Sequence, residues 1–126
     1  MGVLIKELEI IGDKGRSKAK TLFDSGASDS VIRKDVAQKV ASFLRLSEPV
    51  DFVLGDGKIT MTSQYFTGIS FVLKECTFPA QRVLIVDELE DEFILGVDAF
   101  QRWKFRLDFE HEDVIFDKSV LGMRLV

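Results

Sequence analysis

The chain has 126 residues, of which 46% are hydrophobic, and this is enough to build one packed domain over residues 1–126. Its 17 basic and 21 acidic side chains give a net charge of −4, which offers no electrostatic footprint for nucleic acid. No apolar run approaches the roughly 18 residues that a spanning helix needs, so we expect a soluble protein with no nucleic-acid and no membrane partner.

The first residues and the cysteine content bear on the location of the protein. Residues 1–7 lack the basic start and the long apolar stretch of a signal peptide, so secretion is not expected. Cys76 has no second cysteine with which to form an internal disulfide, and we interpret it as a small strand residue in a reducing compartment. The sequence therefore predicts a cytoplasmic protein.

Alternation of apolar and polar residues predicts strands along most of the chain. In chain order, strands are expected at about residues 3–11, 18–23, 50–54, 58–73, 79–86, 104–110 and 113–117. The glycine-containing segments 12–15 and 55–57 are predicted turns. Short strands at close spacing are typical of a small barrel or sandwich, so the expected fold class is all-β.

Two helices are predicted among the strands. Residues 35–46 carry four apolar side chains at spacings of three and four, which give one apolar helical face. These side chains are Val36, Val40, Phe43 and Leu44. A shorter helix is expected over 97–103, with Trp103 closing the core beneath it.

The segment Asp24-Ser25-Gly26-Ala27 is the most informative part of the sequence. It lies between apolar segments typical of buried strands, where a carboxylate is costly to desolvate unless neighbouring groups hold its charge. Gly26 lets the backbone approach the acid closely, and the Ser25 hydroxyl can stiffen the turn by bonding to the main chain. This placement predicts a catalytic carboxylate at Asp24.

A second motif, Phe93-Ile94-Leu95-Gly96-Val97-Asp98, stands downstream and leads into the shorter predicted helix. Taken together in this order, the two motifs resemble those of a retroviral-type (retropepsin-like) aspartic protease subunit. The likeness runs from about residue 3 to about residue 118, and it is closer to the cellular and prokaryotic members than to the viral ones. One conservative difference is Ser25, where most relatives carry threonine.

The resemblance implies a retropepsin-like closed barrel with a flap hairpin and one or two short helices. It implies that Ser25 and Gly26 shape the catalytic loop around Asp24, with Ser25 bonding across to the loop of a second subunit. It further implies substrate contacts from Ala27, Ser28 and Ile94.

Hydrolysis of an amide by carboxylates alone requires two of them. One takes a proton from water and the other, protonated, stabilises the developing oxyanion. Because Asp-Ser-Gly occurs once in this chain, the second acid must come from a second copy, and a two-fold homodimer follows. The terminal segments Val3–Ile11 and Val120–Val126 are expected to be apolar strands that form the dimer contacts.

Residues 50–66, centred on Gly55, Asp56 and Gly57, are interpreted as the flap that closes over a bound peptide. A plain hairpin is the alternative, because Asp-Gly is a common tight-turn pair. The position between the two motifs favours the flap, so we assign substrate contacts to these three residues. An acidic residue at the tip favours basic or polar substrates.

The remaining polar residues receive simpler interpretations. Asp29 either contacts the substrate backbone or caps its own loop, and Asp98 is expected to cap the short helix. The acidic run 87–92 is predicted to be a solvated loop that could repel acidic peptides. His111 is expected in a solvated turn rather than as a metal ligand, so no metal or other cofactor is predicted.

The sequence therefore predicts an aspartic endopeptidase that hydrolyses peptides or proteins. Two alternatives stay open at this point. One is a catalytically inactive retropepsin-fold module that dimerises or binds peptides, because a scaffold can outlive its activity. The other is a half-domain that needs a different subunit.

Overall fold

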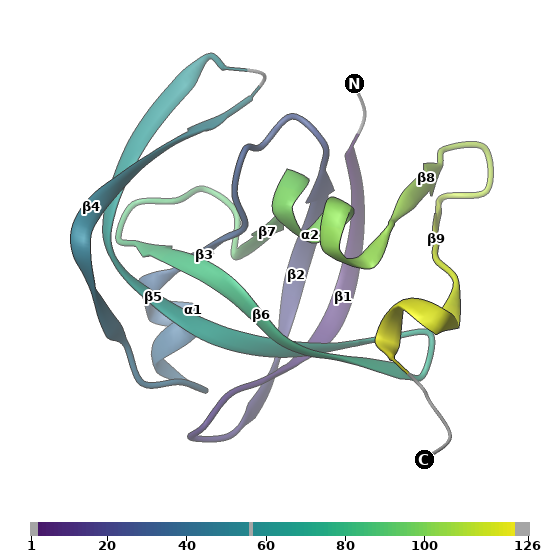
Figure 1. The fold of residues 1–126 in the computed structure, drawn as a ribbon, viewed down its shortest axis with the longest axis horizontal. Helices are drawn as coiled ribbons and strands as arrows, with labels where there is room; N and C mark the ends of the chain where they lie inside the picture. Colours follow the sequence, from purple (N-terminus) through teal and green to yellow (C-terminus); the bar gives the residue numbers. More distant parts are fainter. Residues whose placement is uncertain (1–2, 56, 123–126) are drawn as a thin grey trace.

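The computed structural model describes residues 3–55 and 57–122, and most of these residues lie in β-strands (Figure 1). The strands are β1 (Val3–Ile11), β2 (Arg16–Asp24), β3 (Val31–Arg33), β4 (Leu44–Leu54), β5 (Ile59–Leu73), β6 (Cys76–Val86), β7 (Phe93–Leu95), β8 (Arg106–Asp108) and β9 (Asp113–Ile115). The helices in this part of the chain are α1 (Lys34–Gln38), α2 (Val97–Trp103) and the 3-10 helix η1 (Lys118–Leu121). A mainly-β fold with a few short helices, as the alternation predicts, is therefore confirmed.

In the described part of the chain, seven strands form one sheet in the order β1-β2-β7-β3-β6-β5-β4, and β8 pairs with β9 separately. β1 also pairs with β5 through Glu9, Ile10 and Ile11, so two strands that are far apart in this order meet. The short β7 lies between β2 and β3, parallel to β2 and antiparallel to β3. It therefore connects the two ends of the loop that follows Asp24.

Two groups of buried side chains fill the space around the sheet. The larger group is rich in aromatic rings: Phe71 and Phe78 stack with centroids 5.0 Å apart, and Trp103 meets Phe78 edge-on at 5.2 Å. The smaller group includes Ala27 from the Asp24 loop and Leu54 from the β4–β5 hairpin. Burial of these two side chains in one group holds the hairpin against the loop. The prediction that Trp103 closes the core is confirmed, because it is 3% exposed.

The helix predicted over residues 35–46 is wrong beyond Gln38. α1 ends at Gln38, and β4 begins at Leu44, which pairs with Phe66 of β5. Val40 is fully buried even though it follows the helix. The spacing of three and four is therefore met by a short helix and a turn, and pairing with β5 then claims the backbone from Leu44 onward.

The strand predicted over 104–110 is also shorter than expected. Lys104 adopts a left-handed conformation, with φ 56° and ψ 44°, and ends α2 there. Phe105 is buried without being part of a strand, and pairing begins only at Arg106, opposite Ile115. The alternation thus marks Phe105 correctly as inward-facing, but Phe109 is 51% exposed, and the length of the strand is overstated.

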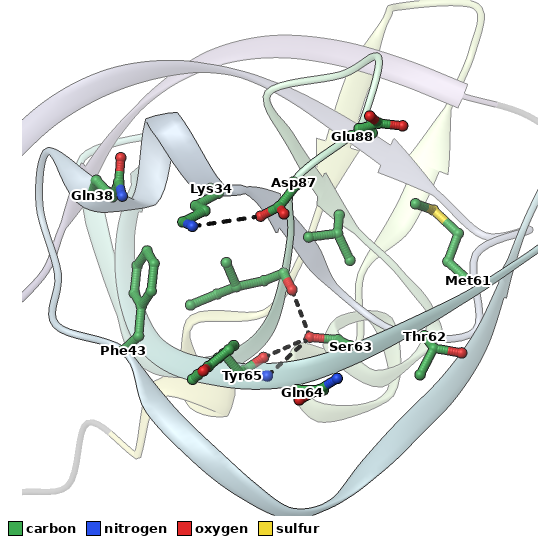
Figure 2. Close-up of a pocket in the computed structure, with 12 residues that line it drawn as sticks. Lys34, Gln38, Phe43, Met61, Thr62, Ser63, Gln64, Tyr65, Asp87 and Glu88 are labelled. Atoms are coloured by element: carbon green, nitrogen blue, oxygen red, sulfur yellow. Dashed lines mark hydrogen bonds and ion pairs between the residues drawn. The ribbon is translucent and has the colours of Figure 1, made fainter.

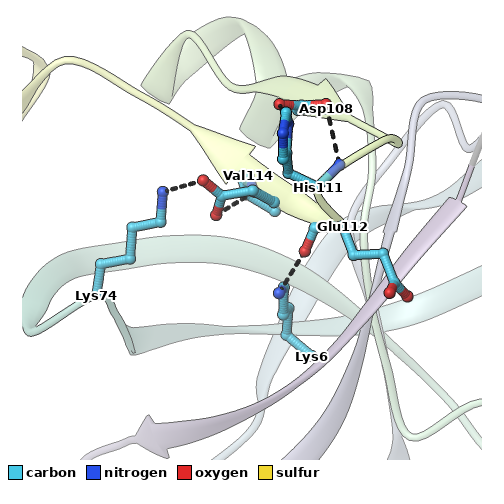
Figure 3. Close-up of polar contacts among 7 residues, drawn as sticks. Lys6, Lys74, Asp108, His111, Glu112 and Val114 are labelled. Atoms are coloured by element: carbon cyan, nitrogen blue, oxygen red, sulfur yellow. Dashed lines mark hydrogen bonds and ion pairs between the residues drawn. The ribbon is translucent and has the colours of Figure 1, made fainter.

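The turn between β8 and β9 is exposed and carries His111, which confirms the predicted solvated turn (Figure 3). The His111 side chain is 71% exposed, and its Nδ1 lies 2.7 Å from Asp108 Oδ2. Two lysines from elsewhere in the chain hold this region. Lys74, in the turn between β5 and β6, has its Nζ 2.8 Å from the Asp113 carboxylate, and Lys6 of β1 donates from its Nζ to the carbonyl of Glu112.

The two terminal segments that are expected to be strands differ in their secondary structure. Val3–Ile11 forms β1, as the alternation predicts. Val120 lies in η1 rather than in a strand, and the rest of the second segment includes residues 123–126, which lie outside the described residues. Across the described chain, no helix combines the length and apolar character that crossing a membrane requires.

Candidate active site

Asp24 is the last residue of β2, and the chain turns back over its carboxylate. The Gly26 N–H donates to Asp24 Oδ1 at 2.8 Å, and the Ala27 N–H donates to the Asp24 carbonyl at 3.2 Å. Only 8% of Asp24 is exposed. The Gly26 N–H stabilises the charge of this buried carboxylate, and the Ala27 N–H holds the turn itself. The half-buried Ser25 and Gly26 form the turn that brings the amide into place.

Gly96 packs against the backbone of the Asp24 loop and fixes its position. A Cβ at Gly96 would lie 2.6 Å from the Ala27 carbonyl oxygen and 2.7 Å from that of Asp29, so only glycine fits. The close approach is completed by the Val97 N–H, which donates to the Ala27 carbonyl at 2.8 Å. The glycine of the second motif therefore allows β7 and α2 to pack directly against the loop.

A chain of buried polar groups continues this contact into the core. Ser30 Oγ accepts from the Gly96 N–H at 3.1 Å and donates to Asp98 Oδ1 at 2.7 Å. Asp98 Oδ2 accepts from the Gln81 amide at 3.3 Å, and Gln81 Oε1 accepts from the Trp103 indole N–H at 2.8 Å. Burial raises the pKa of Asp98, and its hydrogen bond from Ser30 opposes this shift.

The interpretation of Asp98 as the helix cap is corrected by this network. The residue at the N-cap of α2 is Gly96, which has no capping side chain. Asp98 lies in the first turn, where its Oδ1 accepts from the Ala99 N–H at 2.9 Å, and it uses the rest of its carboxylate to hold Ser30 and Gln81. Tertiary partners from β6 and from the Asp24 loop thus determine its role.

The β4–β5 hairpin lies against the other side of the Asp24 loop. The Ser28 N–H donates to the Val53 carbonyl at 3.0 Å, and the Val53 N–H donates to Ser28 Oγ at 3.0 Å. One residue of the loop therefore satisfies both backbone groups of Val53. We name this pair of contacts the Ser28–Val53 clasp.

The hairpin turn has the backbone that its glycines predict. Gly55 and Gly57 adopt positive φ angles of 60° and 84°, and the Lys58 N–H donates to the Gly55 carbonyl at 3.2 Å. Asp56, the third residue assigned to the flap tip, lies outside the described residues. The hairpin predicted between 50 and 66 thus exists as β4 and β5, although both strands extend beyond that range.

A cavity of about 280 Å³ opens beside Asp24, and we name it the Asp24 cavity. The hairpin contributes Gly55 and Met61, and β7 contributes Ile94. Among the predicted site residues, the structure therefore brings together Asp24, Gly55 and Ile94 around one space. It places the remaining described ones in the supporting loop and turn: Ser25, Gly26, Ala27, Ser28, Asp29 and Gly57.

Two residues of that loop have specific internal contacts. Ala27 is fully buried and packs in the smaller core group. Asp29 Oδ2 accepts from Ser28 Oγ at 3.0 Å. A contact within its own loop was one of the two interpretations of Asp29.

One wall of the Asp24 cavity comes from the acidic run 87–92, which is predicted from the sequence to be a solvated loop able to repel acidic peptides. Glu88, Glu90 and Asp91 line the cavity together with the buried Leu89, which is 8% exposed. Desolvation raises the pKa of Asp91, and the negative charges of Glu90 and Asp24 add to this effect. Leu89, an apolar residue within an acidic run, is the signal that this loop is anchored rather than fully solvated.

A larger cavity, of about 640 Å³, lies between α1 and β5 (Figure 2). We assign the candidate chemistry to the smaller cavity because it contains the buried carboxylate. Among the residues that the structure describes, no group of three or more His, Cys, Asp or Glu side chains is arranged to hold a metal ion.

Comparison with known proteins gives the family. The sequence model of the family described as gag-polyprotein putative aspartyl protease matches residues 13–102, which include the Asp24 loop, the hairpin and the motif around Gly96. The chain belongs to this aspartyl protease family. None of the curated proteins matches the chain.

Two solved structures are similar to this aspartyl protease family member. One is the retroviral protease-like domain of Ddi1 from Leishmania major, with a TM-score of 0.60 and 15% identity over 93% of this chain and 89% of that chain. The other is a retropepsin-like aspartic protease from Rickettsia conorii, with a TM-score of 0.47 and 19% identity over 85% of this chain and 82% of that chain. At this identity, the Ddi1 domain supports the fold alone.

Proposed function

We propose that the chain is an aspartic endopeptidase, in which Asp24 of one copy faces Asp24 of a second copy across a two-fold axis. The observation that carries the proposal is the Asp24 carboxylate itself, which is 8% exposed, bonded to the Gly26 N–H and open to the Asp24 cavity. A protein that buries a carboxylate beside a cavity accepts a desolvation cost for which a catalytic role gives a reason.

The chemistry follows from sharing one proton between the two carboxyls. Two carboxyl groups about 3 Å apart cannot both be ionised at the same time, and aspartic proteases are the known example of such a pair. The ionised carboxylate takes a proton from water, whose oxygen bonds to the peptide carbonyl carbon. The protonated partner hydrogen-bonds the oxyanion. The C–N bond then breaks as a proton reaches the leaving nitrogen, giving a carboxylic acid and an amine.

The other predicted residues take supporting roles in this proposal. Ser25 and Gly26 hold the catalytic turn, and the hairpin acts as the flap through Gly55, Asp56 and Gly57. Substrate contacts come from Ala27, Ser28, Asp29 and Ile94. The pairing of β1 with β5 supports a closed barrel, with residues 1–126 as one domain. We place the enzyme in the cytoplasm.

Cleavage of a diverse peptide library by the purified protein, at several mildly acidic to neutral pH values, tests the proposal. Asp24→Asn should abolish cleavage while leaving peptide binding and the sedimentation coefficient unchanged. Asp113→Asn is the matched control, because its carboxylate forms an exposed ion pair with Lys74 and lies on the β8–β9 side of the protein.

Each alternative has its own result in this experiment. Peptide binding without cleavage, before and after Asp24→Asn, identifies an inactive binding module. A strict monomer at micromolar concentration, without cleavage, indicates that a different subunit is required. Cleavage that survives Asp24→Asn refutes the assignment of the catalytic acid.

A further inference from the structure

The main sheet splits into a fork next to α1. Pairing between β5 and β6 stops at Tyr65 and Ile85 in the described chain, and beyond this point the two strands separate. From Ile59 to Ser63, β5 pairs with β4, and Val86 of β6 pairs with β3. The 640 Å³ cavity lies in this fork, so we name it the fork cavity (Figure 2).

Specific hydrogen bonds hold the point where β5 and β6 separate. Ser63 is 2% exposed, and its hydroxyl donates to the Ile85 carbonyl at 2.6 Å while its oxygen accepts from the Tyr65 N–H at 3.2 Å. Figure 2 shows Ser63 beside Tyr65, with the contacts of the Ser63 hydroxyl as dashed lines. The hydroxyl therefore takes the place of a strand partner at the last position where the two strands meet, and it leaves the following edge open by construction.

The open edge of β5 presents backbone groups to the fork cavity. Both backbone groups of Val53 point away from β5, because they bond to Ser28. Asp51 and Thr62 are paired two positions further along, so by the alternation of an antiparallel ladder the N–H and C=O of Thr62 point away from β4. Thr62 lines the fork cavity, which gives an added strand a place to pair.

The lining of the fork cavity suits an extended peptide. Phe43 and Ile85 provide apolar surface, and Tyr65 is 40% exposed at its side. The rim carries Lys34 and Asp87, with Nζ and Oδ1 3.8 Å apart and both side chains well exposed, together with the exposed Glu88 (Figure 2). Apolar pockets beside a polar rim and a strand edge are features of peptide recognition by strand addition.

The fork cavity is continuous in its walls with the Asp24 cavity. Met61 and Glu88 line both spaces. The two cavities therefore adjoin, and a polypeptide in the fork cavity would lie next to the Asp24 cavity. With one lysine against two carboxylates, the rim favours a basic residue in the bound segment.

We propose that the fork cavity is an exosite that binds an extended segment of the substrate polypeptide, outside the cleaved residues, by strand addition to β5. The segment carries a large apolar side chain for the pocket and a lysine or arginine for the rim. The assignment of the occupant as substrate rests on the proposed endopeptidase function.

The first test measures binding without cleavage. Random 12-residue peptides displayed on phage are selected on the Asp24→Asn protein, and the enriched peptides are then synthesised. Gln38→Trp fills the fork cavity from the exposed end of α1, and Gln101→Trp is the matched control on the exposed face of α2. We expect Gln38→Trp to raise the Kd of the enriched peptides at least tenfold, and Gln101→Trp to leave this Kd within twofold of the parent value.

A second variant guards against misfolding of the first. Thr62→Pro removes the edge N–H without breaking a backbone bond to β4, although it also loses the exposed hydrogen bond from Thr62 Oγ1 to Asp51 Oδ1 at 2.6 Å. It should weaken binding to the same extent in a protein with an unchanged circular dichroism spectrum. Enriched peptides that bind Gln38→Trp and Thr62→Pro as tightly as the parent would overturn the proposal. Failure to enrich any peptide would overturn it too.

The second test identifies the occupant by cleavage of reduced, carboxymethylated casein. Gln38→Trp should raise KM for casein at least fivefold and leave kcat/KM for short library peptides unchanged. An unchanged KM for casein refutes the exosite while leaving the endopeptidase intact. Absence of any cleavage by the wild-type chain refutes the endopeptidase, and with it the substrate as occupant. Loss of dimer on Gln38→Trp would make the fork a contact between copies and overturn the proposal.

Discussion

One methyl group at Gly96 should displace the Asp24 loop. A Cβ there lies 2.6 Å from the Ala27 carbonyl oxygen and 2.7 Å from that of Asp29. Both atoms belong to the backbone, so neither can swing aside as the end of a side chain does. Overpacking costs about 1–3 kcal/mol, and two backbone overlaps put Gly96→Ala at about 3 kcal/mol. A domain of this size has roughly 5–15 kcal/mol of stability in total.

Urea unfolding followed by the fluorescence of Trp103, the only tryptophan, measures this loss. Gly68→Ala is the matched control, because a Cβ at Gly68 meets no atom within 4 Å. Its free energy of unfolding should stay constant or rise by roughly 0.4–1 kcal/mol, since alanine restricts the unfolded chain. In thermal unfolding, the Gly96→Ala loss corresponds to a fall in Tm of about 10 °C.

Gly12→Ala separates stability from function. A Cβ at Gly12 overlaps the Val40 carbonyl, so the variant should also be destabilised, but neither residue lines the Asp24 cavity. At a temperature where both variants are folded, Gly96→Ala should lose peptide cleavage and Gly12→Ala should retain it. The reasoning fails if Gly96→Ala unfolds at the same urea concentration as Gly68→Ala.

Three further outcomes follow from the site. Ser28→Ala removes the acceptor of the Val53 N–H, so hydrogen exchange of the Val53 amide should accelerate and the free energy of unfolding should fall by about 1 kcal/mol. Unchanged exchange at Val53 would contradict the Ser28–Val53 clasp. Burial raises the pKa of Asp98, so the folded state binds the proton of this carboxyl more tightly than the unfolded state does. The free energy of unfolding of wild type minus that of Asp98→Asn should therefore decrease as pH rises from about 4 through the folded pKa. A difference between the two urea titrations that grows with pH would contradict this. Asp91→Asn should improve kcat/KM for acidic relative to basic peptides about fivefold at low salt, with no change at 1 M salt, and equal ratios in both proteins would count against a charged wall.

The strands were predictable because their side chains alternate on a surface with one buried face. β1 runs from Val3 to Ile11, as expected from the sequence, and β5 begins within one residue of its predicted start. The helix over 35–46 failed because apolar residues at spacings of three and four fit a five-residue helix followed by a turn just as well. Pairing of Leu44 with Phe66 of β5 ends the helical segment and starts β4. A local sequence pattern contains no information on this long-range contact.

The candidate site was predictable in its motifs and only in part in its walls. The motif around Asp24 and the glycine at position 96 are local signals, and the structure brings them into direct contact. The role of Asp98 depends on Gln81, which is 17 positions away along the chain. The acidic wall depends on the anchoring of Leu89 in the smaller core group. The partner of Asp98 and the packing of Leu89 are set by the fold, although Leu89 stands out in the sequence as an apolar residue within an acidic run.

The Ser28–Val53 clasp limits the affinity that a peptide can gain by taking the place of Val53 beside the Asp24 loop. In the free protein, Ser28 and Val53 already satisfy each other. An incoming main chain that takes up the same donors exchanges one set of bonds for another, and the net enthalpy of that exchange is close to zero. Affinity at this position must then come from burying side chains, so selectivity among ligands should follow the shape and apolar area of the side chain next to Ser28 rather than the length of the extended backbone.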